Sequence, residues 1–180
     1  NVISFSRDGF QVDPIIISNK RKEQLNNNLM LFFTGFSRFS FTIQQEHEKA
    51  IHSKEKQLLE MLSLADKVED ILMNGDLDEF GLMLDHTWRL KRSVNSTVTT
   101  SRIDEIYEAA TRAGALGGKL LGAGGGGFIL LYVQPDKQER VRKALCGLKE
   151  IPFQFETGGA RILYYTSEFY ALPEEVKGKC

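Results

Sequence analysis

One glycine-rich stretch, Gly114–Val133, constrains the fold of this chain more than any other segment. It reads GALGGKLLGAGGGGFILLYV, and the glycines run unbroken from Gly124 to Gly127. The apolar run Phe128–Val133 predicts a buried strand, and Lys119–Gly122 predicts a short strand before it. A hairpin turn needs only one or two glycines with positive φ, so a longer run indicates backbone that a ligand can approach closely. The N–H groups of such a loop can bind an anion, although a turn forced by close packing would use the same residues.

Two nucleotide-binding motifs are mimicked in this stretch and both are rejected. Gly122, Gly124 and Gly127 have the G-x-G-x-x-G spacing of a dinucleotide site, but that motif must open a helix and a strand follows here. Gly118-Lys119 resembles the end of a P-loop, but Leu120 stands where a Ser or Thr must bind magnesium. Neither motif is therefore assigned.

The composition is that of an ordinary globular domain. The chain has 180 residues, 42% hydrophobic and 26% charged, with a net charge of −1. This charge gives no electrostatic reason to expect nucleic acid or an anionic membrane as a partner. No apolar run reaches the roughly 20 residues of a membrane helix, and no secretory pattern opens the chain. Cys146 and Cys180 lack metal-site spacing, which fits a reducing cytoplasm and predicts no metal site.

The remaining elements follow from turn residues and apolar spacing. Further strands are predicted at Val2–Phe5, Gln11–Ile17, Leu29–Thr34, Ile151–Glu156 and Arg161–Tyr165. Helices are predicted from about Ile43 to Met73, from the cap Asp76 to about Arg92, from the cap Ser101 to Gly114, and after Pro135. Connections are predicted at the turn Arg7-Asp8-Gly9, the polar loops through Asn26–Asn28 and Ser93–Thr100, and the aromatic segment Phe36–Phe41.

From Leu29 onward, the order of elements is strand, helices, strand, strand, helix, strand. This is the order of a ferredoxin-like split βαβ fold, an α+β class with an antiparallel sheet. We expect helices on one face of that sheet, with an added helical bundle. The chain starts at Asn1 and enters a strand at once, so we expect a piece of a longer protein.

Several short motifs precede the glycine-rich stretch in a characteristic order. They are Thr34-Gly35-Phe36-Ser37-Arg38, His86-Thr87-Trp88-Arg89-Leu90-Lys91 and Asp104-Glu105-Ile106-Tyr107. With GGKLLGAGGGGF, they resemble the C-terminal half of the GHMP sugar kinases, a family named for galactokinase, homoserine, mevalonate and phosphomevalonate kinases. Within this family, the chain is most similar to the bacterial D-glycero-D-manno-heptose 7-phosphate kinases.

The resemblance implies a two-domain enzyme. Residues 1–20 would be strands that complete an N-terminal kinase domain, and residues 21–180 would be the C-terminal domain. The catalytic residues and the ATP-phosphate loop would belong to the N-terminal half, so this chain alone would be inactive. The implied reaction transfers the γ-phosphoryl group of ATP, with Mg²⁺, to the anomeric hydroxyl of heptose 7-phosphate in the cytoplasm.

The resemblance also indicates which residues contact phosphate or substrate. They are the loop glycines Gly122, Gly124, Gly125, Gly126 and Gly127 and the basic side chains Lys119, His86, Lys91 and Arg38. Each basic residue could equally be an ordinary structural or surface cation. Alternatives are another GHMP sugar kinase, a stand-alone ferredoxin-like module that binds a ligand in the glycine loop, or a structural domain that docks a catalytic chain.

Overall fold

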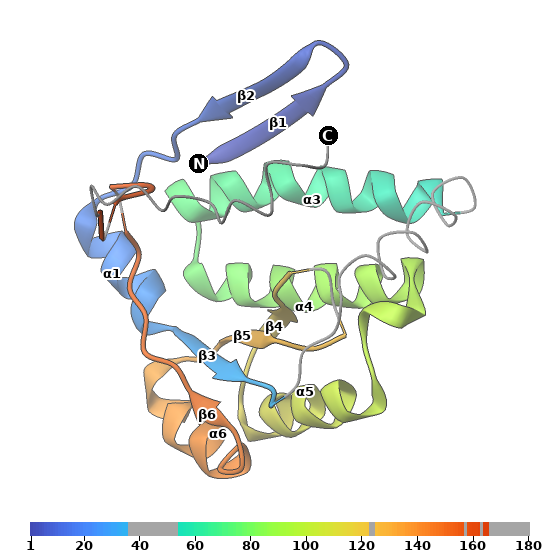
Figure 1. The fold of residues 1–180 in the computed structure, drawn as a ribbon, viewed down its shortest axis with the longest axis vertical. Coiled ribbons are helices and arrows are strands. Elements are labelled where there is room, and N and C mark those ends of the chain that lie inside the picture. The colour runs from blue at the N-terminus through green and yellow to red at the C-terminus, as the bar shows by residue number, and fades with distance from the viewer. Residues whose placement is uncertain (36–53, 123–124, 157, 163, 166–180) are drawn as a thin grey trace, which may run out of the picture.

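A four-stranded antiparallel sheet forms the centre of the structure, a computed structural model that describes residues 1–35, 54–122, 125–156, 158–162, 164 and 165 (Figure 1). Its strands are β3 (Leu29–Phe33), β4 (Gly117–Leu120), β5 (Phe128–Tyr132) and β6 (Lys149–Glu150), in the order β4-β5-β3-β6. Since β5 lies between β3 and β4 and is antiparallel to both, β3 and β4 run in the same direction. This is a split βαβ arrangement, which confirms the predicted α+β fold class.

The helices connect these strands. They are α1 (Asn19–Asn27), α3 (Glu55–Met73), α4 (Leu77–Val94), α5 (Ser101–Ala113) and α6 (Gln138–Ala144), with short 3-10 turns η2 (Ser96–Val98) and η3 (Pro135–Lys137). The helices α3 and α4 lie side by side and form the predicted added bundle (Figure 1). Within the described ranges, no helix has both the length and the apolar character needed to cross a membrane.

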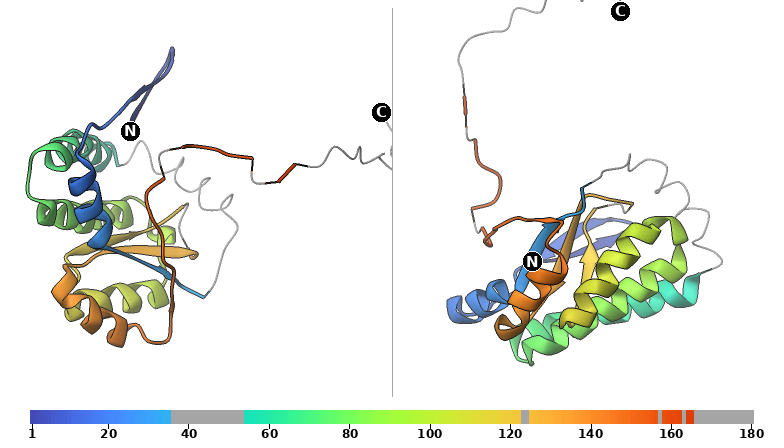
Figure 2. Two further views of the ribbon diagram at one scale, coloured as in Figure 1. Left: turned by 90° about the vertical axis from the view of Figure 1, so that its left-hand side faces the viewer. Right: turned by 90° about the horizontal axis from the view of Figure 1, so that it is seen from below.

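Both faces of the sheet are covered, so the prediction of helices on one face is wrong. On β5, Ile129 and Leu131 join a buried cluster with residues of α5 and α6. Their neighbours Leu130 and Tyr132 join a second cluster with residues of α1 and α4. Successive strand residues point to opposite faces, so the sheet lies between these two groups of helices (Figure 2). The reason is that β5 is apolar at every position, as expected for a strand buried on both faces.

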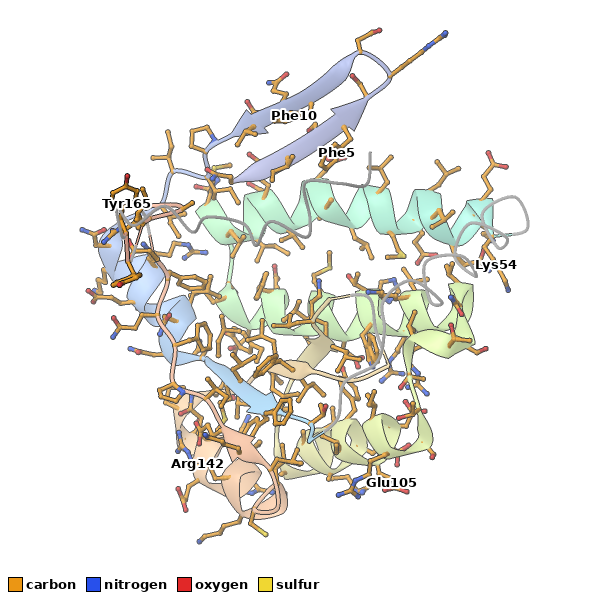
Figure 3. All side chains as sticks on the ribbon, in the orientation of Figure 1. Phe5, Phe10, Lys54, Glu105, Arg142 and Tyr165 are labelled. Carbon is orange, nitrogen blue, oxygen red and sulfur yellow. The ribbon has the colours of Figure 1, made fainter. Side chains whose placement is uncertain are left out.

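A separate hairpin, β1 (Val2–Ser6) with β2 (Gly9–Asp13), projects beside α3 (Figure 1). The predicted turn is confirmed, but the second strand ends at Asp13 because Pro14 has no N–H to donate. Phe5 and Phe10 are 81% and 71% exposed on this hairpin (Figure 3). A cavity of about 410 Å³ lies between the hairpin and helices α3 and α4, so the hairpin packs loosely on the rest of the chain.

Three N-terminal and central predictions need correction. Residues Asn19–Asn27 form a helix rather than a loop, because the Ser18 hydroxyl accepts a bond from the Arg21 N–H and caps it. The cap of α5 is Thr100 rather than Ser101. The strand before the glycine loop starts at Gly117 instead of Lys119.

The C-terminal strands are also overpredicted. The strand expected at Ile151–Glu156 does not form: the edge strand β6 is Lys149–Glu150, and only the Ile151 N–H, which donates to the Leu31 carbonyl, continues its pairing. The described residues of Arg161–Tyr165 form no strand. The segment Phe36–Phe41 and the start of the helix expected at Ile43 lie outside the described residues.

Candidate functional site

The loop between β4 and β5 holds glycines in a backbone conformation that other residues rarely adopt. Gly122, Gly125 and Gly127 have φ values of 78°, 76° and 99°. A Cβ added at Gly122 or Gly127 would meet nothing within 4 Å, so there is open space beside these two residues. Gly125 and Gly126 are buried, and Gly124 lies outside the described residues.

Hydrogen bonds from other elements hold the part of the loop next to β5. The Gly125 N–H donates to the carbonyl of Val98 in η2, at 3.0 Å. The backbone N–H and the hydroxyl of Thr34, at the end of β3, both donate to the Gly127 carbonyl, each at 2.9 Å. The segment Gly125–Gly127 is therefore held in place by its neighbours.

Close packing explains a different pair of glycines, in β4 itself. A Cβ at Gly117 would lie 2.0 Å from the Gly81 carbonyl oxygen of α4, and one at Gly118 would lie 2.5 Å from the Leu130 carbonyl oxygen. These two glycines let α4 and β5 approach the strand, as glycine in a strand often does. The glycine-rich stretch thus contains a packing segment followed by an open loop.

Lys119, in β4, and Lys91, in the last turn of α4, lie close enough for their charges to interact. Burial lowers the pKa of the Lys91 ammonium from its ordinary value, and the positive charge of Lys119 lowers it further. Neither ammonium has a hydrogen bond or an ion pair with any residue that the structure describes. Among the described residues the two lysines have no counterion, and Lys119 lies in the strand that leads into the loop.

The other predicted basic residues do not join this pair. The Nε2 atom of His86 lies 2.9 Å from an Oε1 atom of Glu60 and links α4 to α3. At about 100° per residue, His86 and Lys91 point to different sides of the helix. Arg38 lies outside the described residues.

Asp85 of α4, which lies beside Gly117 of β4 and was not a predicted site residue, forms hydrogen bonds with two residues of the quoted motifs. The Tyr107 hydroxyl of α5 donates to the Asp85 carboxylate of α4 at 2.7 Å, and the Arg89 Nε atom donates to the other oxygen of Asp85 at 2.7 Å. Burial, and next the bond to Asp85, raises the pKa of Tyr107. The only signal in the sequence was the i, i+4 spacing of Asp85 and Arg89.

A polar cavity of about 520 Å³ lies between the end of α4 and the start of α5, and the sequence did not predict it. Its lining consists of Arg89, Arg92, Ser93, Ser96, Thr99, Thr100, Ser101 and Asp104. Arg92 pairs with Asp104 at 3.2 Å, and Arg89 pairs with Asp85, so the charges of this cavity are already balanced. Within the described ranges, no three His, Cys, Asp or Glu side chains gather to hold a metal ion.

Comparison with known proteins finds GHMP kinases that are similar to this chain. Residues 61–149 match the family described as GHMP kinases C terminal. A D-glycero-alpha-D-manno-heptose 7-phosphate kinase of Campylobacter jejuni is 33% identical over 137 residues, which are 74% of this chain and 40% of that protein. Other relatives include a bifunctional fucokinase, mevalonate kinases and galactokinases.

Two solved structures have a similar fold. A D-glycero-D-manno-heptose 1-phosphate kinase from Bacteroides thetaiotaomicron has a TM-score of 0.54 at 28% identity, covering 85% of this chain and 41% of that one. The L. major mevalonate kinase, solved with R-mevalonate, has a TM-score of 0.66 at 18% identity, covering 82% of this chain and 47% of that one. The chain spans less than half the length of each of these relatives.

Proposed function

Since residues 61–149 belong to the GHMP kinase family as its C-terminal domain, we propose that the intact protein is an ATP-dependent sugar kinase. The observation that carries the proposal is the glycine loop, which is fixed at Gly125 and Gly127 but open beside its backbone. Phosphoryl transfer depends mainly on positioning and on electrostatic stabilisation. A fixed loop without side chains lets protein backbone approach the transferred group closely.

The proposed acceptor is the anomeric hydroxyl of D-glycero-D-manno-heptose 7-phosphate, and the product is the 1,7-bisphosphate. Similarity to the Campylobacter jejuni heptose 7-phosphate kinase supports this choice. The unpaired cations Lys91 and Lys119 suit an anionic acceptor better than a neutral one. A cytoplasmic setting, where ATP and sugar phosphates are available, goes with this proposal.

The proposed cofactors are ATP and Mg²⁺. Magnesium takes oxygen ligands and usually bridges nucleotide phosphates in such reactions, but the described residues offer no cluster of carboxylates for it. We therefore assign the ligands of Mg²⁺, the ATP-phosphate loop and the catalytic acid or base to the N-terminal kinase domain. In this proposal, the role of the present chain is to bind the acceptor and to close the glycine loop on the site.

The proposed domain division places residues 1–20 with the N-terminal domain and residues 21–180 in the C-terminal domain. Its support is the exposure of Phe5 and Phe10 on a hairpin that packs loosely on the remainder. A two-stranded hairpin alone is only marginally stable in water, and a larger sheet would stabilise it.

The test is a kinase assay of the intact protein with ATP, Mg²⁺ and a panel of acceptors. The panel contains heptose 7-phosphate, the unphosphorylated heptose, galactose, fucose and mevalonate, and phosphorus NMR identifies the phosphorylated position of each product. We expect the highest kcat/KM with heptose 7-phosphate. A preference for another acceptor would move the protein to another branch of the family, and no ADP release with any acceptor would favour a ligand-binding module.

A further inference from the structure

The short turn η2, which joins α4 to α5, contacts the glycine loop directly. The Gly125 N–H donates to the Val98 carbonyl of η2 at 3.0 Å. Val98 is fully buried and belongs to the same core cluster as Ile129 of β5 and Ile103 of α5. Since residues in a close-packed core have little room to move, this carbonyl gives the loop a fixed acceptor.

Asn95 determines the backbone of that turn. Its N–H donates to the Lys91 carbonyl at the end of α4, and its carbonyl accepts from the Val98 N–H. Its side-chain Oδ1 atom accepts from both the N–H and the hydroxyl of Thr97, each at 2.8 Å. This is the Asx-turn geometry with which an asparagine shapes the residues that follow it. The direction of the Val98 carbonyl therefore depends on the Asn95 side chain.

Thr34 holds the loop from a second element. It follows β3 directly, and its N–H and hydroxyl both donate to the Gly127 carbonyl, each at 2.9 Å. The two anchoring side chains are almost completely buried, with 7% exposure for Asn95 and 4% for Thr34. Gly126, between the two anchored glycines, is buried as well. The loop next to β5 is thus held by two residues that lie outside the glycine-rich stretch.

We propose that Asn95 and Thr34 are positioning residues for phosphoryl transfer, because they fix the place of the glycine loop beside the transferred group. The inference rests on the proposed function and adds to its site two side chains from η2 and the end of β3. Both side chains are buried, so they act through the loop and not on the substrate. A misplacement of about 1 Å at such a site can cost a factor of about 100 in rate, so their loss should lower kcat and leave KM unchanged.

The first test is kinetic and uses the intact protein with ATP and the acceptor that it phosphorylates best. Asn95→Ala removes the acceptor of the turn, and Thr34→Val removes the hydroxyl at nearly constant size. We expect kcat to fall about tenfold for Asn95→Ala and about threefold for Thr34→Val, which retains the backbone bond to Gly127, with the KM of both substrates within about twofold of wild type. Asn74→Ala is the matched control, because Asn74 is exposed at the end of α3. If Asn95→Ala does not fold, Thr34→Val carries the kinetic test alone.

Conservative variants separate positioning from a general structural role. Asn95→Ser supplies a hydroxyl that can accept the bond from the Thr97 N–H, and Thr34→Ser retains the hydroxyl, so kcat should return to within about twofold of wild type. Asn95→Ser also removes the Nδ2 donor, which is buried and has no partner among the described residues. If Asn95→Ser is as slow as Asn95→Ala, catalysis needs the amide rather than the turn, and the inference is overturned. A higher KM with an unchanged kcat, or no change in either constant, would overturn it too.

The second test does not depend on catalysis. Hydrogen exchange of the Gly125 amide, followed by NMR in the intact protein, reports whether its bond to Val98 persists. We expect exchange at least about tenfold faster in Asn95→Ala and at the wild-type rate in Asn95→Ser, while the amides of β5 stay protected in both. Unchanged exchange at Gly125 in Asn95→Ala would overturn the inference whatever the kinase assay gives. A wild-type protein without turnover would instead reject the proposed function, and the exchange rates would still decide whether Asn95 fixes the loop.

Discussion

At the scale of single residues, glycines serve opposite purposes within one stretch. A Cβ at Gly117 would collide with the Gly81 carbonyl oxygen at 2.0 Å, whereas one at Gly122 would meet nothing within 4 Å. The first glycine permits packing, and the second is exposed and has a φ of 78°. Substitutions at the two kinds of position should therefore affect different properties.

Gly117→Ala should destabilise the fold by about 3 kcal/mol, because neither α4 nor β4 can move easily to admit a methyl group. Urea unfolding followed by circular dichroism measures this loss. Gly147→Ala is the control, since a Cβ there meets nothing within 4 Å. Equal stability of the two variants would show that the strand can shift away from α4.

Gly125→Val should leave the fold largely intact but nearly abolish turnover in the intact protein. Gly125 has a φ of 76°, which a β-branched residue adopts only with strain, and the new side chain would enter the loop. Gly159→Val is the control for backbone strain alone, because Gly159 has a φ of 63° at an exposed position outside the loop. If turnover stays within a few-fold of wild type and the melting temperature is unchanged, the loop acts only as a turn between two strands.

Lys91→Met should stabilise the chain at pH 7 while it weakens use of the sugar phosphate. The pKa of Lys91 is lowered below 10.5 in the folded state, so the folded chain binds this proton less tightly than the unfolded chain. The contribution of Lys91 to the stability of the wild-type chain is present above pH 10.5 and is lost as pH falls through the lowered pKa. We expect a gain of up to about 1 kcal/mol at pH 7, after allowance for solvent screening, that is lost as the pH rises through the lowered pKa to above 10.5.

Urea unfolding of wild type and Lys91→Met, at pH 7 and above pH 10.5, measures this difference in stability. The same substitution at Lys143, which is exposed on α6, should have no effect at either pH. A variant less stable than wild type at pH 7 would mean that Lys91 has a stabilising partner.

At the scale of elements, α4 and α5 hold the strand that leads into the glycine loop. The bond between Tyr107 and Asp85 joins the two helices directly beside β4. Trp88 and Tyr107 also pack ring to ring, with centroids 6.2 Å apart. A substitution that breaks this contact between α4 and α5 should shift β4 and, with it, the glycine loop that follows.

Tyr107→Phe should lower stability by about 1–2 kcal/mol, because the Asp85 carboxylate loses one of its two hydrogen bonds in a half-buried place. Thermal unfolding checks the loss. The control is Tyr164→Phe, where the ring is 82% exposed. A loss no greater than in the control would mean that Arg89 alone satisfies Asp85.

The sequence predicted elements well where apolar spacing was strong, as in α4 and β5. It missed α1, which buries only Leu25 and so has no apolar stripe. It overpredicted a strand at Arg161–Tyr165, because alternation shows a strand-like side-chain pattern but not whether a partner strand is present. At the site, the glycine loop was readable from the sequence, whereas the meeting of Lys91 with Lys119 depends on how α4 packs against β4.

At the scale of the whole molecule, apolar side chains lie exposed on two segments outside the central sheet. They are Ile3, Phe5, Phe10 and Val12 on the hairpin and Ile162, Tyr164 and Tyr165 beyond β6 (Figure 3). Such surfaces usually mark contacts with another protein or domain. Their natural partner in our proposal is the N-terminal kinase domain.

Residues 1–180 alone should show no sustained ATP turnover with heptose 7-phosphate and Mg²⁺, and should self-associate through these surfaces. The described residues offer no metal-binding cluster, and our proposal assigns the ATP-phosphate loop to the N-terminal domain. Activity should appear when a separately produced N-terminal half is added, and sedimentation should then show a one-to-one complex. Sustained turnover by residues 1–180 alone would contradict this division of the site.

The pairing of β3 with β5 has a consequence for how the chain folds during its synthesis. Phe33 pairs with Phe128, so β3 cannot pair with β5 until the segment that contains Phe128 has left the ribosome. Roughly a hundred residues separate these strands, which corresponds to ~5–20 s of translation at the usual rate. Throughout that interval the apolar segment Leu29–Phe33 has no strand beside it, and it is the segment most in need of a chaperone.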